Sequence, residues 1–120
     1  MRVLGMKEAN FIRFKDSFSS LTPAKELASL ALSRENYIRA GVAGNYKTSR
    51  KLLAKLSMDK DDDVRSSVAS HRNTSKTVLL ELAKDKSYKV RQSVSGNPHT
   101  PDDVLSLLAD DEDCLVRQHS

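Results

Sequence analysis

Apolar residues recur along this chain with a period of 26 residues, and no gap is needed to keep the register. Two columns hold leucine in every copy, and a third holds a β-branched residue in every copy. Their members are Leu27, Leu53, Leu79 and Leu105, then Leu30, Leu56, Leu82 and Leu108, and then Ile38, Val64, Val90 and Val116. A fixed period of this length indicates one structural unit copied in tandem, with each copy burying its apolar face against the next.

Polar residues keep the same register, which divides the chain into copies. A threonine and an arginine recur in all of them, namely Thr22, Thr48, Thr74 and Thr100, and Arg39, Arg65, Arg91 and Arg117. The copies span residues 22–47, 48–73, 74–99 and a truncated 100–120. Residues 1–21 are predicted to form an N-terminal helical cap or a decayed copy. The helically spaced Phe11, Phe14 and Phe18 would cover the first copy, or form an exposed docking stripe.

The spacing within each copy predicts two helices. Thr22 followed by Pro23 indicates a helix start, with the threonine as N-cap and the proline in the first turn. A first helix of about three turns is expected to end near Asp59 and its equivalents. Val64 and Val68 have the spacing of one buried edge, which predicts a second, shorter helix. No stretch alternates in the manner of a strand, so the predicted fold class is all-α, a short solenoid of paired helices.

The third and fourth copies also carry a recognisable motif. The run from Val90 to Pro101 reads Val-Arg-Gln-Ser-Val-Ser-Gly-Asn-Pro-His-Thr-Pro, and Leu105, Leu108-Ala109 and Asp111 follow it. This run resembles the leucine-rich repeat variant family, to which the HEAT repeats are a related theme. In the earlier copies Asn45-Tyr46 and His71-Arg72 stand where the motif has Asn-Pro.

The resemblance covers the chain from residue 22 onward, and it implies both a fold and a role. The implied fold is a right-handed superhelix of paired helices, the second of them short and often 3₁₀-like. The implied role is non-catalytic binding of another macromolecule, most often a protein. One member of the family is described as carrying an iron–sulfur cluster on a separate cysteine-rich segment. This chain has a single cysteine, Cys114, so no cofactor is expected.

Composition changes this picture in two respects. The net charge of +4 is unevenly placed, because residues 1–99 hold 19 Lys and Arg against 10 Asp and Glu, whereas the last copy is acidic. Such asymmetry can steer a partner or bring copies together, or it can simply keep a rod in solution. The sequence shows neither a signal peptide nor a run of about 20 apolar residues, and its lone Cys114 cannot form an internal disulfide. A cytoplasmic setting is therefore predicted, without membrane association.

The arginine column is the first candidate site. A row of guanidinium groups could bind phosphates or acidic side chains. The alternative is a ladder of ion pairs that holds the copies in register, because an aspartate precedes Arg65, Arg91 and Arg117 by six residues. Arg39 has Ser33 at that place, so we expect it to be the freest of the four.

The exposed side of the second helices is the second candidate. Small or hydrogen-bonding residues lie in register there, while the residues beside them differ from copy to copy. That variation is typical of a recognition surface, although small residues also allow short helices to pack closely. The predicted protein-binding residues are Tyr37, Arg39, Asp62, Ser66, Tyr88, Lys89 and Gln92.

The basic start of the first helices is the third candidate. It supports an alternative function, the binding of nucleic acid, although a solvated surface explains the same residues. The residues concerned are Lys25, Arg50, Lys51, Lys55 and Lys76.

Catalysis has little support in the sequence. His71, His99 and His119 fall in three different columns of the repeat, and no metal-binding or phosphate-binding motif is present. We therefore predict neither catalytic nor metal-binding residues. The truncated last copy lacks the apolar residue that closes the others, so we expect a monomer or a weak homodimer formed through residues 104–120.

Overall fold

The computed structural model describes residues 15–16, 19 and 21–117. These residues hold eight helices arranged in pairs and no strand, which confirms the all-α class. The predicted cap at residues 1–21, with its three phenylalanines, lies almost wholly outside the described residues. In chain order the pairs are α2 (Ala24–Leu30) with α3 (Asn36–Gly44), α4 (Arg50–Leu56) with α5 (Asp62–Ser70), α6 (Lys76–Leu82) with α7 (Tyr88–Gly96), and α8 (Asp102–Leu108) with α9 (Cys114–Arg117).

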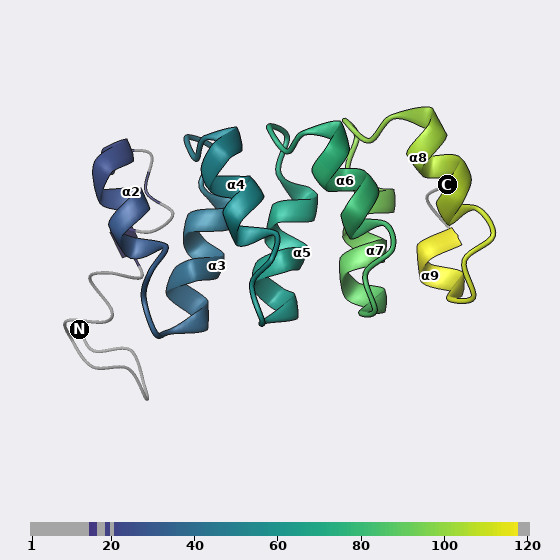
Figure 1. The fold of residues 1–120 in the computed structure, drawn as a ribbon, viewed down its shortest axis with the longest axis horizontal. Helices are drawn as coiled ribbons and strands as arrows, with labels where there is room; N and C mark the ends of the chain where they lie inside the picture. Colours follow the sequence, from purple (N-terminus) through teal and green to yellow (C-terminus); the bar gives the residue numbers. More distant parts are fainter. Residues whose placement is uncertain (1–14, 17–18, 20, 118–120) are drawn as a thin grey trace.

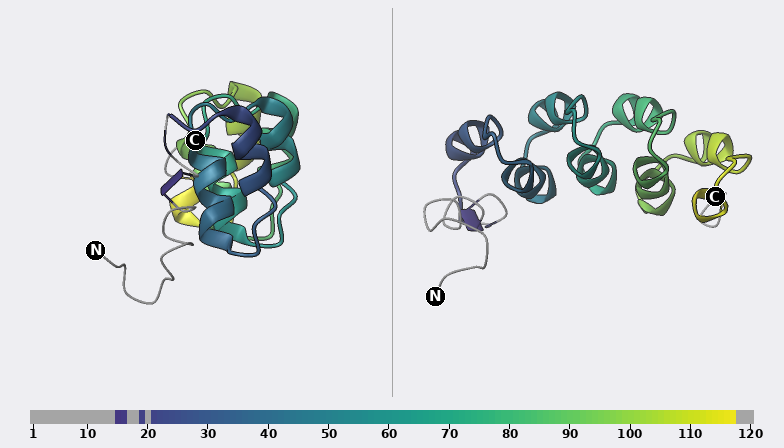
Figure 2. Two further views of the ribbon diagram at one scale, coloured as in Figure 1. Left: turned by 90° about the vertical axis from the view of Figure 1, so that its left-hand side faces the viewer. Right: turned by 90° about the horizontal axis from the view of Figure 1, so that it is seen from below.

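The helix pairs stand side by side along the long axis of a body that measures 45 × 27 × 21 Å (Figure 1). Figure 2 shows two rows, one made of the first helices and the other of the second helices. The second helices contact one another directly along their row, α3 with α5, α5 with α7 and α7 with α9. The first helices pack mainly against second helices. The second helices therefore form the continuous layer of the molecule.

The connections between helices fall on two opposite edges. The turns within pairs, at residues 31–35, 57–61, 83–87 and 109–113, lie along the lower edge in Figure 1, which we call the turn edge. The linkers between pairs, at residues 45–49, 71–75 and 97–101, lie along the upper edge, which we call the linker edge. Each first helix begins at the linker edge, and each second helix begins at the turn edge.

The lengths of the helices differ from the prediction. The first helices have seven residues each, and α3, α5 and α7 are α-helices of nine. The expected longer first helix and shorter, 3₁₀-like second helix are therefore wrong. The reason is visible in α5, which begins at Asp62, two residues before the first apolar residue, Val64. An apolar pattern cannot detect a polar first turn.

The threonines do not cap the helices as predicted. The N-cap residues are the ones that follow them, Pro23, Ser49, Ser75 and Pro101. The hydroxyl of Thr48 instead donates to the carbonyl of Val42 at 2.6 Å, and Thr74 and Thr100 do the same with Val68 and Val94. Each hydroxyl gives a second hydrogen bond to a carbonyl near the end of the preceding second helix, which also accepts from the amide of the C-cap residue. The threonines thus close the linkers.

The apolar columns form one core that runs the length of the row. The β-branched column is fully buried from Ile38 to Val116, and Leu27, Leu53 and Leu79 are at most 1% exposed. Leu105 breaks the pattern, since it is only partly buried while its neighbour Val104 is fully buried. Among the described residues α8 is the last helix of its row, so Leu105 has a neighbouring first helix on one side only. None of the helices that the structure describes is both long and apolar enough to span a bilayer.

Candidate interaction surface

The arginine column forms a ladder between neighbouring helix pairs. The Nε of Arg39 lies 2.8 Å from Oδ2 of Asp59, and its Nη2 lies 3.2 Å from Oδ1 of the same carboxylate. Its Nη1 donates to the carbonyl of Ser33, in the turn of its own pair, at 2.8 Å. Each such arginine therefore ties its own turn to the next pair through a two-pronged ion pair. The same arrangement joins Arg65 to Asp85 and Arg91 to Asp111.

These bonds confirm that the arginine column forms a ladder of ion pairs between helix pairs, but the aspartates that take part differ from the expected ones. The aspartate six residues before each arginine offers only its backbone carbonyl to that arginine. Its carboxylate binds the arginine 20 residues earlier, in the preceding pair. The role of Arg39 in binding a partner stays a prediction. Arg39 was also expected to be the freest member, but it is 7% exposed and each of its three guanidinium nitrogens makes a hydrogen bond. That prediction is wrong, because Asp59 belongs to the next pair and not to Arg39's own.

The ion pairs shift the ionisation of their members. The hydrogen bonds that the Arg39 guanidinium donates to Asp59 raise the pKa of this guanidinium, and they outweigh the opposing effect of burial. At the other end of the ladder, burial opposes ionisation of Asp111. Bonds from the Asp113 amide and from Arg91 outweigh it and hold the pKa of Asp111 below its ordinary value. The pKa of Asp61 is also lowered, since bonds from Asn36 and the Asp63 amide prevail over desolvation.

Acidification is therefore expected to destabilise the protein. An aspartate whose pKa is lowered by folding is protonated first in the unfolded chain, so its contribution is present above about pH 4 and is lost as the pH falls further. We expect the free energy of unfolding, measured with urea between about pH 2 and 7, to decline as the pH falls below about 4. Asp111→Asn should flatten this decline because it removes one of the shifted groups. An unchanged slope in that variant would contradict the assignment.

A second ladder, which the sequence analysis missed, follows the linker edge. The side chain of Asn45 donates from Nδ2 to the carbonyl of Ser19 at 2.8 Å and accepts from the Lys47 amide at 3.0 Å. His71 repeats this with a ring, Nε2 lying 2.7 Å from the Asn45 carbonyl and Nδ1 accepting from the Asn73 amide. Neutral imidazole protonated on Nε2 satisfies both bonds. Asn97 continues the column by donating to the carbonyls of Ala69 and His71.

The sequence signal for this ladder is the single column Asn45, His71 and Asn97. His71→Asn is expected to preserve it, with a change in stability within about 1 kcal/mol. His71→Ala should cost about 1–3 kcal/mol, because the Asn73 amide loses its acceptor and the Asn45 carbonyl keeps only its bond from the Thr48 amide. Thermal unfolding of the two variants makes the comparison, and equal losses would contradict the ladder.

The exposed side of α3, α5, α7 and α9, which we call the second-helix face, holds the remaining predicted binding residues. Tyr37 is half-buried against the core, Asp62 accepts a bond from Ser87 at 3.0 Å, and Ser66 shares a hydroxyl bond with Ser93. These three residues help to join neighbouring helices. Tyr88, which is 44% exposed, together with the exposed Lys89 and the half-buried Gln92, presents side chains to solvent on α7.

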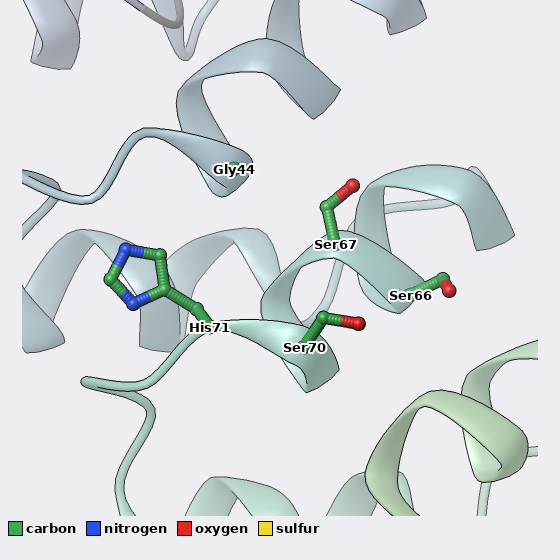
Figure 3. Close-up of a pocket in the computed structure, with 5 residues that line it drawn as sticks. All are labelled: Gly44, Ser66, Ser67, Ser70 and His71. Carbon is green, nitrogen blue, oxygen red and sulfur yellow. The ribbon is translucent and has the colours of Figure 1, made fainter. Parts of the chain in front are cut away.

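A shallow hollow of about 230 Å³ opens on the same face between α3 and α5 (Figure 3). Gly44 contributes no side chain, and a Cβ added there would meet nothing within 4 Å, so the hollow is open at this point. Both ring nitrogens of His71 are engaged, so this histidine has no lone pair with which to activate a neighbouring serine. The serine hydroxyl groups that line the hollow can therefore form hydrogen bonds with a bound molecule. Its lining consists of Gly44, Ser66, Ser67, Ser70 and His71.

Three aspartates at the start of α5 are the densest group of acids on this face. One carboxylate oxygen each from Asp61, Asp62 and Asp63 lies within 4.8 Å of the others. The Asp61 carboxylate accepts hydrogen bonds from the Asn36 side chain and from the Asp63 amide, and the Asp62 carboxylate accepts one from the Ser87 hydroxyl. Acids in a first turn also stabilise a helix by themselves, so local structure accounts for the group.

The basic residues predicted at the start of the first helices lie on α2, α4 and α6 and are all exposed. Lys76 forms an ion pair with Asp103 at 2.7 Å, between the starts of α6 and α8. This bond lowers the pKa of the Asp103 carboxyl. The others are Lys25, Arg50, Lys51 and Lys55.

One segment of the chain matches a known protein family. The family model described as leucine rich repeat variant matches residues 88–113, which run from the start of α7 through α8 to the turn before α9. The resemblance inferred from the sequence is thereby confirmed for this segment. No curated protein and no solved structure matches the chain.

Proposed function

We propose that this chain is a non-catalytic α-solenoid of four 26-residue helix pairs, and that its second-helix face binds another protein. One observation carries the proposal. The second helices contact one another without interruption, so their exposed side chains form one surface along the row. Those side chains differ at equivalent positions while the buried valines do not. The starts of successive second helices read Asn36-Tyr37, Asp62-Asp63 and Tyr88-Lys89.

The chemistry of the face favours a protein partner with a mixed polar surface. Tyr88 offers an aromatic ring with a hydroxyl group, and Lys89 and Asp63 offer opposite charges on neighbouring helices. Tyrosine is enriched at the centres of protein interfaces because it buries a large area at low entropic cost. The hydroxyl-lined hollow beside α5 gives a main chain room to approach.

Removal of the exposed pair on α7 tests this function. Tyr88→Ala combined with Lys89→Ala should weaken capture of a specific protein from a native extract, by roughly tenfold or more, because hot-spot side chains contribute about 2 kcal/mol or more. The fold should be preserved, since both side chains are exposed.

A matched control changes the other row of helices. Lys55→Ala with Glu81→Ala alters two exposed residues on α4 and α6, and it should leave capture unchanged. If the control variant loses the partner and the α7 variant keeps it, the second-helix face is not the binding surface. If nothing is retained by the unaltered chain, the proposed function is wrong.

A further inference from the structure

The linker edge carries a cluster of cations that the proposed protein-binding face does not use. Five basic residues lie on two neighbouring linkers and the helix starts that follow them, and all are exposed. No acidic residue lies between positions 45 and 58 or between 71 and 80. We call these residues the basic linker cluster, and they are Lys47, Arg50, Lys51, Arg72 and Lys76.

The opposite edge differs in charge. On the turn edge the cations alternate with acids, as Arg34 does with Glu35 and Lys60 with Asp61. The acids that stabilise the starts of the second helices lie on this edge, because those helices begin there. The architecture therefore separates the charges, leaving the middle of the linker edge positive.

The cluster is arranged as two groups in neighbouring helix pairs. Arg50 and Lys51 start α4, and Arg72 lies in the linker before α6. One linker recurs with each helix pair along the same edge, so the two groups follow one another along the row (Figure 1). Lys76 already binds Asp103, and Lys47 also has a contact within the protein, which leaves Arg50, Lys51 and Arg72 as the cations that would meet a ligand. Arginine and lysine in a line suit a chain of phosphates.

An aromatic side chain accompanies these cations. Tyr46 is 57% exposed in the first of the two linkers, and Arg72 occupies the equivalent position of the next linker. The side chain of Asn73 donates from Nδ2 to the carbonyl of Tyr46 at 3.4 Å, which ties the two linkers together. A tyrosine ring and a guanidinium group both provide planes on which a base can stack. Exposed phosphate-binding and base-stacking groups thus lie on adjacent linkers.

We propose that the basic linker cluster binds single-stranded nucleic acid, with Arg50, Lys51 and Arg72 on the phosphates and Tyr46 stacked on a base. A lipid surface fits less well, because residues 45–51 and 71–77 of this edge expose no aliphatic side chain that could insert. An acidic protein would satisfy the cations, but it would not use the ring of Tyr46 in this way. This surface is separate from the second-helix face, so the two proposals fail independently.

The salt dependence of oligonucleotide binding tests the cluster. Fluorescence anisotropy with labelled single-stranded DNA and RNA of mixed sequence should show binding that weakens by about 20-fold between 50 and 200 mM salt, as expected for about three phosphate contacts. Arg50→Gln with Lys51→Gln should reduce the slope of log affinity against log salt by about 1.4. Comparison of the DNA and RNA arms identifies the preferred strand.

Two further variants decide the interpretation. Lys84→Gln with Lys86→Gln removes the same charge from exposed positions on the turn edge and should leave the slope unchanged. Tyr46→Ala should weaken single-strand binding by about 5- to 100-fold and affect duplex binding little. The proposal is overturned if neither oligonucleotide binds at 50 mM salt, or if both double variants reduce the slope equally. Binding of the chain to anionic vesicles but not to oligonucleotides would also overturn it.

Discussion

Asp85→Ala is expected to destabilise the protein by about 3–5 kcal/mol, which is the cost of leaving a buried charge without its partner. The side chains of Arg65 and Asp85 are only 10% and 11% exposed, and their two hydrogen bonds join α5 to the turn before α7. Without the carboxylate, the guanidinium keeps only its bond to the Asp59 carbonyl. Urea unfolding measures the loss of free energy directly.

The matched control is an ion pair of the same kind on the surface. Asp103→Ala breaks the pair with Lys76, in which both side chains are at least 60% exposed, so the loss should be far smaller than that of Asp85→Ala because water already screens the pair. The double replacement Arg65→Met with Asp85→Leu should cost less than Asp85→Ala alone, because it leaves no unpaired charge. If Asp85→Ala costs no more than Asp103→Ala, the ladder does not hold the pairs together.

Leu53→Ala is the second large effect, with an expected loss of about 2–5 kcal/mol. Leu53 is fully buried in α4 and belongs to the core that joins all the helix pairs, so its removal opens a cavity that its neighbours cannot fill. The melting temperature and the urea midpoint should both fall.

Leu107→Ala serves as the control for this change. Leu107 lies on α8 and is 54% exposed, so the same chemical replacement should cost well under 2 kcal/mol. Equal losses at positions 53 and 107 would show that the column is not the core.

The periodic columns predicted the buried residues well, because burial depends on position within the copy. Ile38, Val64, Val90 and Val116 are all fully buried, and only Leu105 among the paired leucine columns departs clearly from expectation. Leu105 lies on α8, the last of the first helices among the described residues, and a repeating pattern does not distinguish that helix from the others.

The polar contacts were less predictable, because many of them cross between helix pairs. The sequence placed an aspartate six residues before Arg65, yet the carboxylate that binds Arg65 lies 20 residues after it. That choice depends on how neighbouring pairs stack. His71 also departs from the sequence motif, which has asparagine at its place. Its ring nevertheless reproduces the two hydrogen bonds that Asn45 makes at the equivalent position.

The most direct test of the central claim is to ask which row of helices touches a partner. A photo-reactive amino acid at position 92, on α7, should cross-link the chain to one specific protein in a native extract. The same group at position 55, on α4 in the other row, should give no such product. Cross-linking from position 55 and none from position 92 would contradict the assignment of the second-helix face as the binding surface.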